Sequence, residues 1–85
     1  MEITDKELNY KISLNNINIY VFYLKLKLMY LECPEARNTL PKENRLYLLK
    51  YTTDKFKKYI NIRHKILAGN KDIIIPYISL EELYS

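Results

Sequence analysis

The spacing of apolar residues predicts a helix in the first half of the chain. Between residues 13 and 33, apolar side chains recur at i, i+3, i+4, i+7, i+11 and i+14, as on one face of a helix. This face comprises Ile17, Tyr20, Val21, Leu24, Leu28 and Leu31. Polar residues recur seven apart at Asn18, Lys25 and Glu32, which leaves only a narrow stripe for water. The pattern is typical of a largely buried central helix, with Ser13 as its N-cap.

A β-hairpin is the competing prediction for this segment. Residues 24–28 alternate strictly between apolar and basic, residues 19–23 are rich in β-formers, and Asn15-Asn16 suits a turn. We favour the helix and keep the hairpin as the alternative. Upstream, Thr4 and Glu7 fit a capping box that opens a short N-terminal helix.

The second half of the chain begins after a connection that runs from Pro34 to Pro41. Pro41 suits the first position of a long amphipathic helix over residues 42–68, and Gly69-Asn70 suits its end. The predicted core face of this helix comprises Leu46, Leu49, Thr53, Phe56, Ile60 and Leu67. Because threonine favours caps over helix interiors, the segment is either one helix or two helices with a turn near Thr53.

The C-terminal residues predict a small β component. Residues 72–78 are β-type but contain Pro76, which suits an edge strand. Ser79 and Glu82 then fit a capping box that opens a short terminal helix. We therefore expect a mostly α fold with a small β component (α+β), as one globular domain over residues 1–85.

Charge is concentrated in the long helix. Residues 42–68 contain eight basic and two acidic residues, a net charge of +6, whereas the whole chain is only +4. At 100° per residue, Asp54 and seven other residues share a face opposite the predicted core face. The seven are the predicted partner-binding residues: Tyr47, Lys50, Tyr51, Lys57, Lys58, Asn61 and Lys65. Such a mixture suits phosphates or an acidic protein surface, and its alternative is an ordinary solvated face.

The composition excludes most catalytic chemistry. His64 is the only histidine and Cys33 the only cysteine, so the chain lacks a four-ligand metal site and a nucleophile–base pair with an orienting group. With Gly69 as the only glycine, glycine-rich phosphate loops are excluded too. We expect no enzyme activity, no cofactor and no metal.

The same sequence suggests where the protein works. A single cysteine indicates a reducing compartment, and the N-terminus lacks a signal-peptide pattern. The longest apolar run, residues 19–24, is far shorter than the ~20 residues of a membrane span, so we expect a cytoplasmic protein. Abundant Ile, Asn, Lys and Tyr, all encoded by A/T-rich codons, suit a phage, a plasmid or a low-GC bacterium, and we favour a phage or another mobile element.

Three functional hypotheses follow. The first is a small non-catalytic interaction protein that binds and inhibits or modulates a host protein or nucleoprotein complex through the basic, tyrosine-rich face. The alternative is a winged-helix or helix-turn-helix DNA-binding regulator, with a turn at Thr52-Thr53 and a wing at residues 72–78. The third is a subunit of a larger assembly or a homodimer, which exposure of residues 17–31 in the monomer would indicate.

Overall fold

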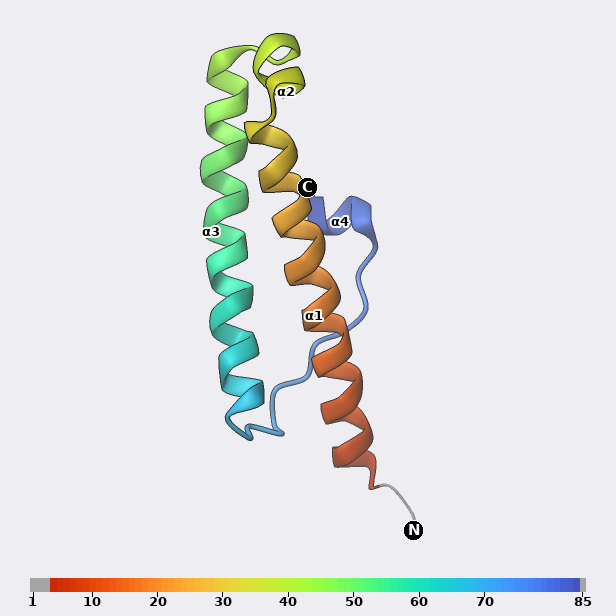
Figure 1. The fold of residues 1–85 in the computed structure, drawn as a ribbon. Coiled ribbons are helices and arrows are strands. Elements are labelled where there is room, and N and C mark those ends of the chain that lie inside the picture. Colours follow the sequence, from red (N-terminus) through yellow and green to blue (C-terminus); the bar gives the residue numbers. More distant parts are fainter. Residues whose placement is uncertain (1–3, 85) are drawn as a thin grey trace.

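The computed structural model describes residues 4–84, so the predicted domain 1–85 includes four residues that lie outside this range. In chain order, the helices are α1 (Asp5–Glu32), α2 (Pro34–Thr39), α3 (Lys42–Leu67) and α4 (Leu80–Tyr84). Helices α1 and α3 form a long antiparallel hairpin with α2 at its closed end, and the short helix α4 lies against α1 (Figure 1) and also contacts α3 through Lys55 and Phe56. The molecule is elongated, with extents of 55 × 20 × 17 Å.

Helix α1 is continuous over 28 residues. Thr4 caps it, because its Oγ1 accepts a hydrogen bond of 3.2 Å from the backbone N–H of Glu7. The prediction of a helix over residues 13–33 is confirmed, and the hairpin alternative is wrong. The N-cap role of Ser13 is wrong as well: a helix that has begun upstream extends at little cost, so it continues through Ser13.

The proline-flanked connection contains a helix of its own. Cys33 has an extended backbone, with φ −74° and ψ 158°, because a following proline disfavours the helical region. Pro34 then opens α2 at a position where its missing N–H is harmless. Pro41 is the N-cap of α3 rather than its first residue. The chain therefore reverses direction between Cys33 and Pro41.

Helix α3 is unbroken, so the predicted long helix is confirmed and the split near Thr53 is wrong. Its inner face differs from the predicted one: Thr52 and Ile66 are buried, whereas Leu46 and Leu67 are each 48% exposed. Thr52 and Ile66 each precede a predicted core residue by one position, whereas Phe56 of the predicted face does pack against the core, so the inner face is rotated by less than one residue. The core face was predicted from the apolar residues, but the small side chain of Thr52 also packs well against a neighbouring helix and is buried.

The predicted edge strand is wrong, and residues 4–84 form no β-strand. We call residues 73–79 the C-terminal strap. Its backbone pairs with side chains of α1: the Ile75 N–H donates to Ser13 Oγ at 2.9 Å, and Asn16 Nδ2 donates to the Ile75 carbonyl at 2.9 Å. Buried backbone groups need partners, and here a helix supplies them in place of a second strand. The fold is therefore all-helical and not α+β.

The strap delivers α4 to the hairpin. Leu83 of α4 is 1% exposed and packs with Tyr20 and Leu24 of α1, and Phe56 of α3 packs against this cluster. Ser79 caps α4, since its Oγ accepts a 3.2 Å hydrogen bond from the Glu82 N–H, as its sequence predicts. Although α1 is long, no helix within residues 4–84 has the combined length and apolar character required to cross a membrane.

Candidate functional site

The candidate site is the outer face of α3, which faces away from α1 (Figure 1). All seven predicted partner-binding residues are exposed there. They are Tyr47, Lys50, Tyr51, Lys57, Lys58, Asn61 and Lys65. One continuous helix holds them, so their order along the surface follows directly from the helical repeat. Exposure agrees with a binding face, whereas binding itself stays a prediction.

Two tyrosines mark the N-terminal half of this face. The rings of Tyr47 and Tyr51 are stacked, with centroids 6.3 Å apart and planes 13° apart. Tyr47 is 69% exposed, the most of any large apolar or aromatic side chain on α3. The ammonium group of Lys55 lies 5.7 Å from the centre of the Tyr51 ring. The two tyrosines lie one helical turn apart, and stacking restricts the side-chain rotation of both rings.

Two open depressions flank Tyr51. One, of about 260 Å³, is lined by Tyr47, Lys50, Tyr51 and Asp54. The other, of about 390 Å³, is lined by Tyr51, Asp54, Lys55 and Lys58. Lysine ammonium groups and tyrosine hydroxyls can donate hydrogen bonds to carboxylates, while Asp54 can accept one from a basic group. The surface therefore has hydrogen-bond donors and acceptors on both sides of the stacked Tyr51 ring.

Three basic residues of α3 are turned inward and belong to the fold. Arg45 Nη1 donates to the Leu31 carbonyl at 3.3 Å, and Arg63 Nε donates to Asn18 Oδ1 at 2.6 Å. Lys55 Nζ donates to the Leu83 carbonyl at 2.7 Å. The charge of residues 42–68 is thus divided between packing against α1 and α4 and the outer face.

The end of α4 is held by one lysine from each long helix. Lys27 Nζ donates to the Tyr84 carbonyl at 2.8 Å, close to the bond from Lys55 to Leu83. Burial lowers the pKa of Lys27 below its ordinary 10.5, and the Lys55 cation lowers it further. Burial also lowers the pKa of Lys55, with a smaller contribution from the Lys58 cation. Cations at a helix C-terminus stabilise its unpaired carbonyls, which compensates for their closeness.

Two tyrosines near these lysines have raised pKa values, whereas those of the lysines are lowered. Burial raises the pKa of Tyr59 above 10.0, and the neighbouring Tyr20 and Tyr51 add to this shift. Burial also raises the pKa of Tyr84, with a contribution from Tyr23. These phenols stay protonated well above neutral pH, so each can donate a hydrogen bond. The Tyr84 hydroxyl does so to the Tyr23 carbonyl at 3.0 Å.

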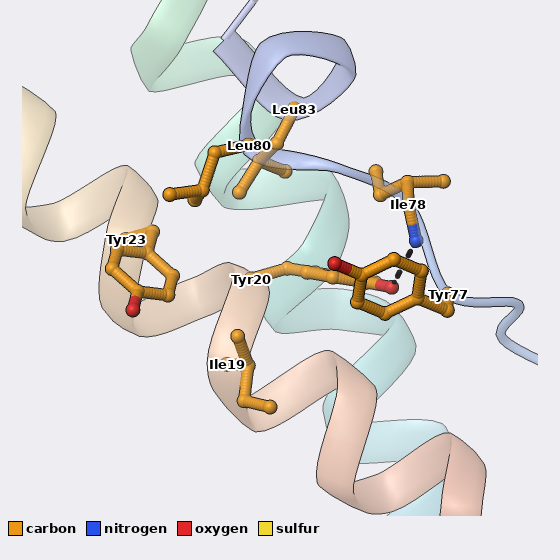
Figure 2. A pocket seen from close by; sticks show the side chains of 7 residues that line it. All are labelled: Ile19, Tyr20, Tyr23, Tyr77, Ile78, Leu80 and Leu83. Atoms are coloured by element: carbon orange, nitrogen blue, oxygen red, sulfur yellow. Dashed lines mark hydrogen bonds between the residues drawn. The ribbon is translucent and has the colours of Figure 1, made fainter.

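A more enclosed hollow lies away from the predicted face, between α1 and the C-terminal strap (Figure 2). It has a volume of about 220 Å³ and is lined by Ile19, Tyr20, Tyr23, Tyr77, Ile78, Leu80 and Leu83. The Tyr20 hydroxyl points to the strap, donates to the Pro76 carbonyl at 2.7 Å and accepts from the Ile78 N–H at 2.7 Å. With its one buried hydroxyl already bonded, the hollow offers mainly apolar contact.

Three polar side chains of α1 that bond to the strap were not predicted from the sequence, although their spacing was a signal for them. Ser13, Asn16 and Tyr20 fall at i, i+3 and i+7, on the flank of an otherwise apolar face. Polar side chains at such spacing beside a buried face need partners, and an extended backbone is one source of them. The spacing of these polar residues therefore indicates a site on α1 for an extended segment, and the strap occupies it.

The single cysteine and the single histidine lie far apart in the fold. Cys33 is half-buried at the junction of α1 and α2, and exposed His64 lies in the last turn of α3, at the opposite end of the hairpin (Figure 1). Within residues 4–84, no three His, Cys, Asp or Glu side chains lie close enough to hold a metal ion.

Comparison with protein-family models, with curated proteins and with solved structures found no match to this chain.

Proposed function

We propose that this protein is a non-catalytic binding protein whose α3 outer face docks on an acidic surface of another protein and modulates its activity. The observation that carries the proposal is the exposure of all seven predicted residues on one continuous helix. Lysines on this face supply long-range attraction to acid groups, and the tyrosines supply contact area at low entropic cost. A host protein of the cytoplasm remains the partner that the sequence favours.

The arrangement of the aromatic rings favours a protein partner over a nucleic acid. Proteins that bind single strands stack bases on open aromatic faces. Tyr47 and Tyr51 stack on each other, so each ring already has one face covered. Arg45, Lys55 and Arg63 bond within the chain, which reduces the positive charge available to phosphates. Nucleic-acid binding is therefore an outcome to be tested and is not the proposal.

The winged-helix alternative is withdrawn. That fold needs a wing of β-strands and two helices separated by a turn. Residues 73–79 instead form the strap along α1, and α3 passes through Thr52 and Thr53 without a break.

The proposal is tested by reversing charge on the face. Replacing Lys57, Lys58 and Lys65 together with glutamate should leave the helical content unchanged, because all three are exposed. Partner capture should be lost. The readout is photo-cross-linking in cells from a reactive amino acid at position 61, with adducts identified by mass spectrometry.

A matched control changes net charge equally but elsewhere. Replacing Lys6, Lys25 and Lys71 with glutamate alters three exposed lysines outside α3 and should preserve the adduct. An adduct that survives reversal on α3, or that both variants lose, contradicts a specific face. Anisotropy titrations with labelled DNA and RNA complete the test, because submicromolar binding that persists at physiological salt would replace the protein partner with a nucleic acid.

A further inference from the structure

The outward face of α1 is apolar, in contrast to that of α3. Six large apolar side chains on this face are 39–61% exposed. Together with Asn15 they form what we call the outer row of α1: Leu8, Ile12, Asn15, Ile19, Phe22, Leu26 and Met29. Exposed apolar residues are ordinary when scattered, whereas a continuous row marks an interaction surface.

The spacing of the outer row matches a helix as its partner. Successive members are separated by four, three, four, three, four and three residues, the repeat of a coiled-coil seam. From Leu8 to Met29 the row extends over about 32 Å at 1.5 Å per residue. Helix α3 does not cover the row, because the buried side of α1 lies around Ile17, Leu24 and Leu31, and the strap reaches only its edge at Ile19.

The exposed area is large enough for a specific interface. A large apolar side chain offers on the order of 150–200 Å², and roughly half of each remains exposed here, so the row presents several hundred Å². That is at the upper end of single patches on monomers, about 300–600 Å², and approaches the ~800 Å² per partner of a standard interface. Tyr30, Tyr77 and Leu80, which are also exposed, border the row and extend it.

Charges beside the row are complementary to those of a second copy of this chain. The flank toward α3 contains Lys11, Asn18, Lys25 and Glu32 at seven-residue intervals. When two copies of α1 pair antiparallel with Ile19 opposite Phe22 of the second copy, Lys11 of each faces Glu32 of the other. Two opposite-charge pairs then close the two ends of the seam. A shift by one heptad would instead oppose Lys11 and Lys25, which disfavours that register.

We propose that two copies of this chain associate through the outer rows of α1, antiparallel, in a self-complementary interface. The contact is isologous, so it closes with two chains and leaves both α3 faces free. Asn15 faces Leu26 of the second copy, and this polar residue in the seam reduces affinity, as expected for a reversible dimer. The proposal concerns a surface separate from α3 and does not depend on the proposed function.

The first experiment is sedimentation equilibrium across the micromolar range. We expect a mass approaching twice the 10.3 kDa of one chain, with dissociation on dilution. Phe22→Glu, at the centre of the seam, should weaken association by about tenfold or more. Tyr47→Glu is the control, because it places the same charge at an exposed aromatic position on α3 and should leave the mass unchanged. A monomer at every concentration, or equal effects of both variants, overturns the proposal.

Charge exchange tests the orientation. Lys11→Glu and Glu32→Lys should each weaken the dimer by about two- to fivefold, and the double variant should recover wild-type association. Circular dichroism verifies that each variant remains helical. Failure of the double variant to recover overturns the antiparallel pairing.

Cross-linking provides a second readout of orientation. With Cys33 replaced by serine, Ile12→Cys and Met29→Cys in the same chain should oxidise to disulfides between positions 12 and 29 of different copies. Links from 12 to 12 and from 29 to 29 would show a parallel pair and overturn the proposal. Binding of a monomer to vesicles of anionic phospholipid, sensitive to Phe22→Glu, would assign the row to a membrane surface instead.

Discussion

Helices α1 and α3 form one hairpin and have similar lengths, 28 and 26 residues, yet their outer faces carry opposite chemistry. The outer face of α3 displays lysines and the stacked pair Tyr47 and Tyr51. That of α1 displays a row of large apolar side chains from Leu8 to Met29. The two helices are thus alike in length and differ in the side chains that they expose to solvent.

The difference follows from the number of neighbours that each helix has. Helix α3 packs mainly on α1, so one apolar face suffices and the rest of its surface is polar. Helix α1 contacts α3 on one side and the strap with α4 on another, and it remains apolar on a third. A helix that is apolar all round is ordinarily surrounded. The apolar third side of α1 is the surface that the proposed dimer would cover, whereas the outer face of α3 is polar and can remain in contact with water.

The largest expected change in the free energy of unfolding comes from truncating a buried leucine of α1, and an exposed leucine of α3 provides the comparison. Leu24→Ala should lower the free energy of unfolding by about 2–5 kcal/mol, because Leu24 is 1% exposed at the contact with Leu83. Leu46→Ala, at a position 48% exposed, should cost about 0.5 kcal/mol. Urea denaturation of both variants provides the measurement. Equal losses would contradict the observed orientation of α3, in which Leu46 faces solvent.

The next largest change in stability is expected from removing a buried tyrosine hydroxyl, and an exposed tyrosine hydroxyl provides the comparison. Tyr20→Phe should cost about 1–3 kcal/mol, because it leaves the Ile78 N–H and the Pro76 carbonyl without their partner. Tyr47→Phe removes a hydroxyl from an exposed ring and should have little effect. Amide hydrogen exchange offers the sharper test, since the Ile78 amide should lose protection in the first variant only. Unchanged protection would mean that the strap is held without this bond.

The smallest effect concerns the two lysines that meet at α4. In Lys55→Gln the pKa of Lys27 should rise partway toward 10.5, because one neighbouring cation is gone while burial, the larger cause, remains. Carbon-13 NMR of the Lys27 side chain during a pH titration measures the shift. A Lys27 pKa that does not change would show that the two ammonium groups do not interact.

The sign of the associated pH effect on stability is fixed. Between the lowered pKa of Lys27 in the folded state and 10.5, the unfolded chain binds more protons, so this group makes the free energy of unfolding rise with pH. The effect is small because the ammonium group remains largely in contact with water. Tyr59 and Tyr84 act in reverse, since their raised pKa values make the folded state lose stability as pH increases above 10.0.

The sequence alone favoured helices over residues 13–33 and 42–68 from the 3.6-residue spacing of apolar side chains, although it left open a hairpin in the first segment and a break near Thr53 in the second. It also located the basic face, since lysines and tyrosines at that spacing must share one side of α3. The caps at Thr4 and Ser79 were readable for the same reason: a cap depends only on residues within one turn. Each of these features is local, so no distant partner was needed to predict it.

The tertiary structure decided what depends on distant neighbours. Residues 73–79 have the composition of a strand, but their backbone finds Ser13, Asn16 and Tyr20 of α1 rather than another strand. The inner face of α3 includes Thr52 instead of Leu46, because the surface of α1 determines which side chains fit against it. The exposure of the outer row of α1 likewise became visible only once α3 and the strap had taken their places. Local periodicity fixes which residues share a face, whereas only packing fixes which face is covered.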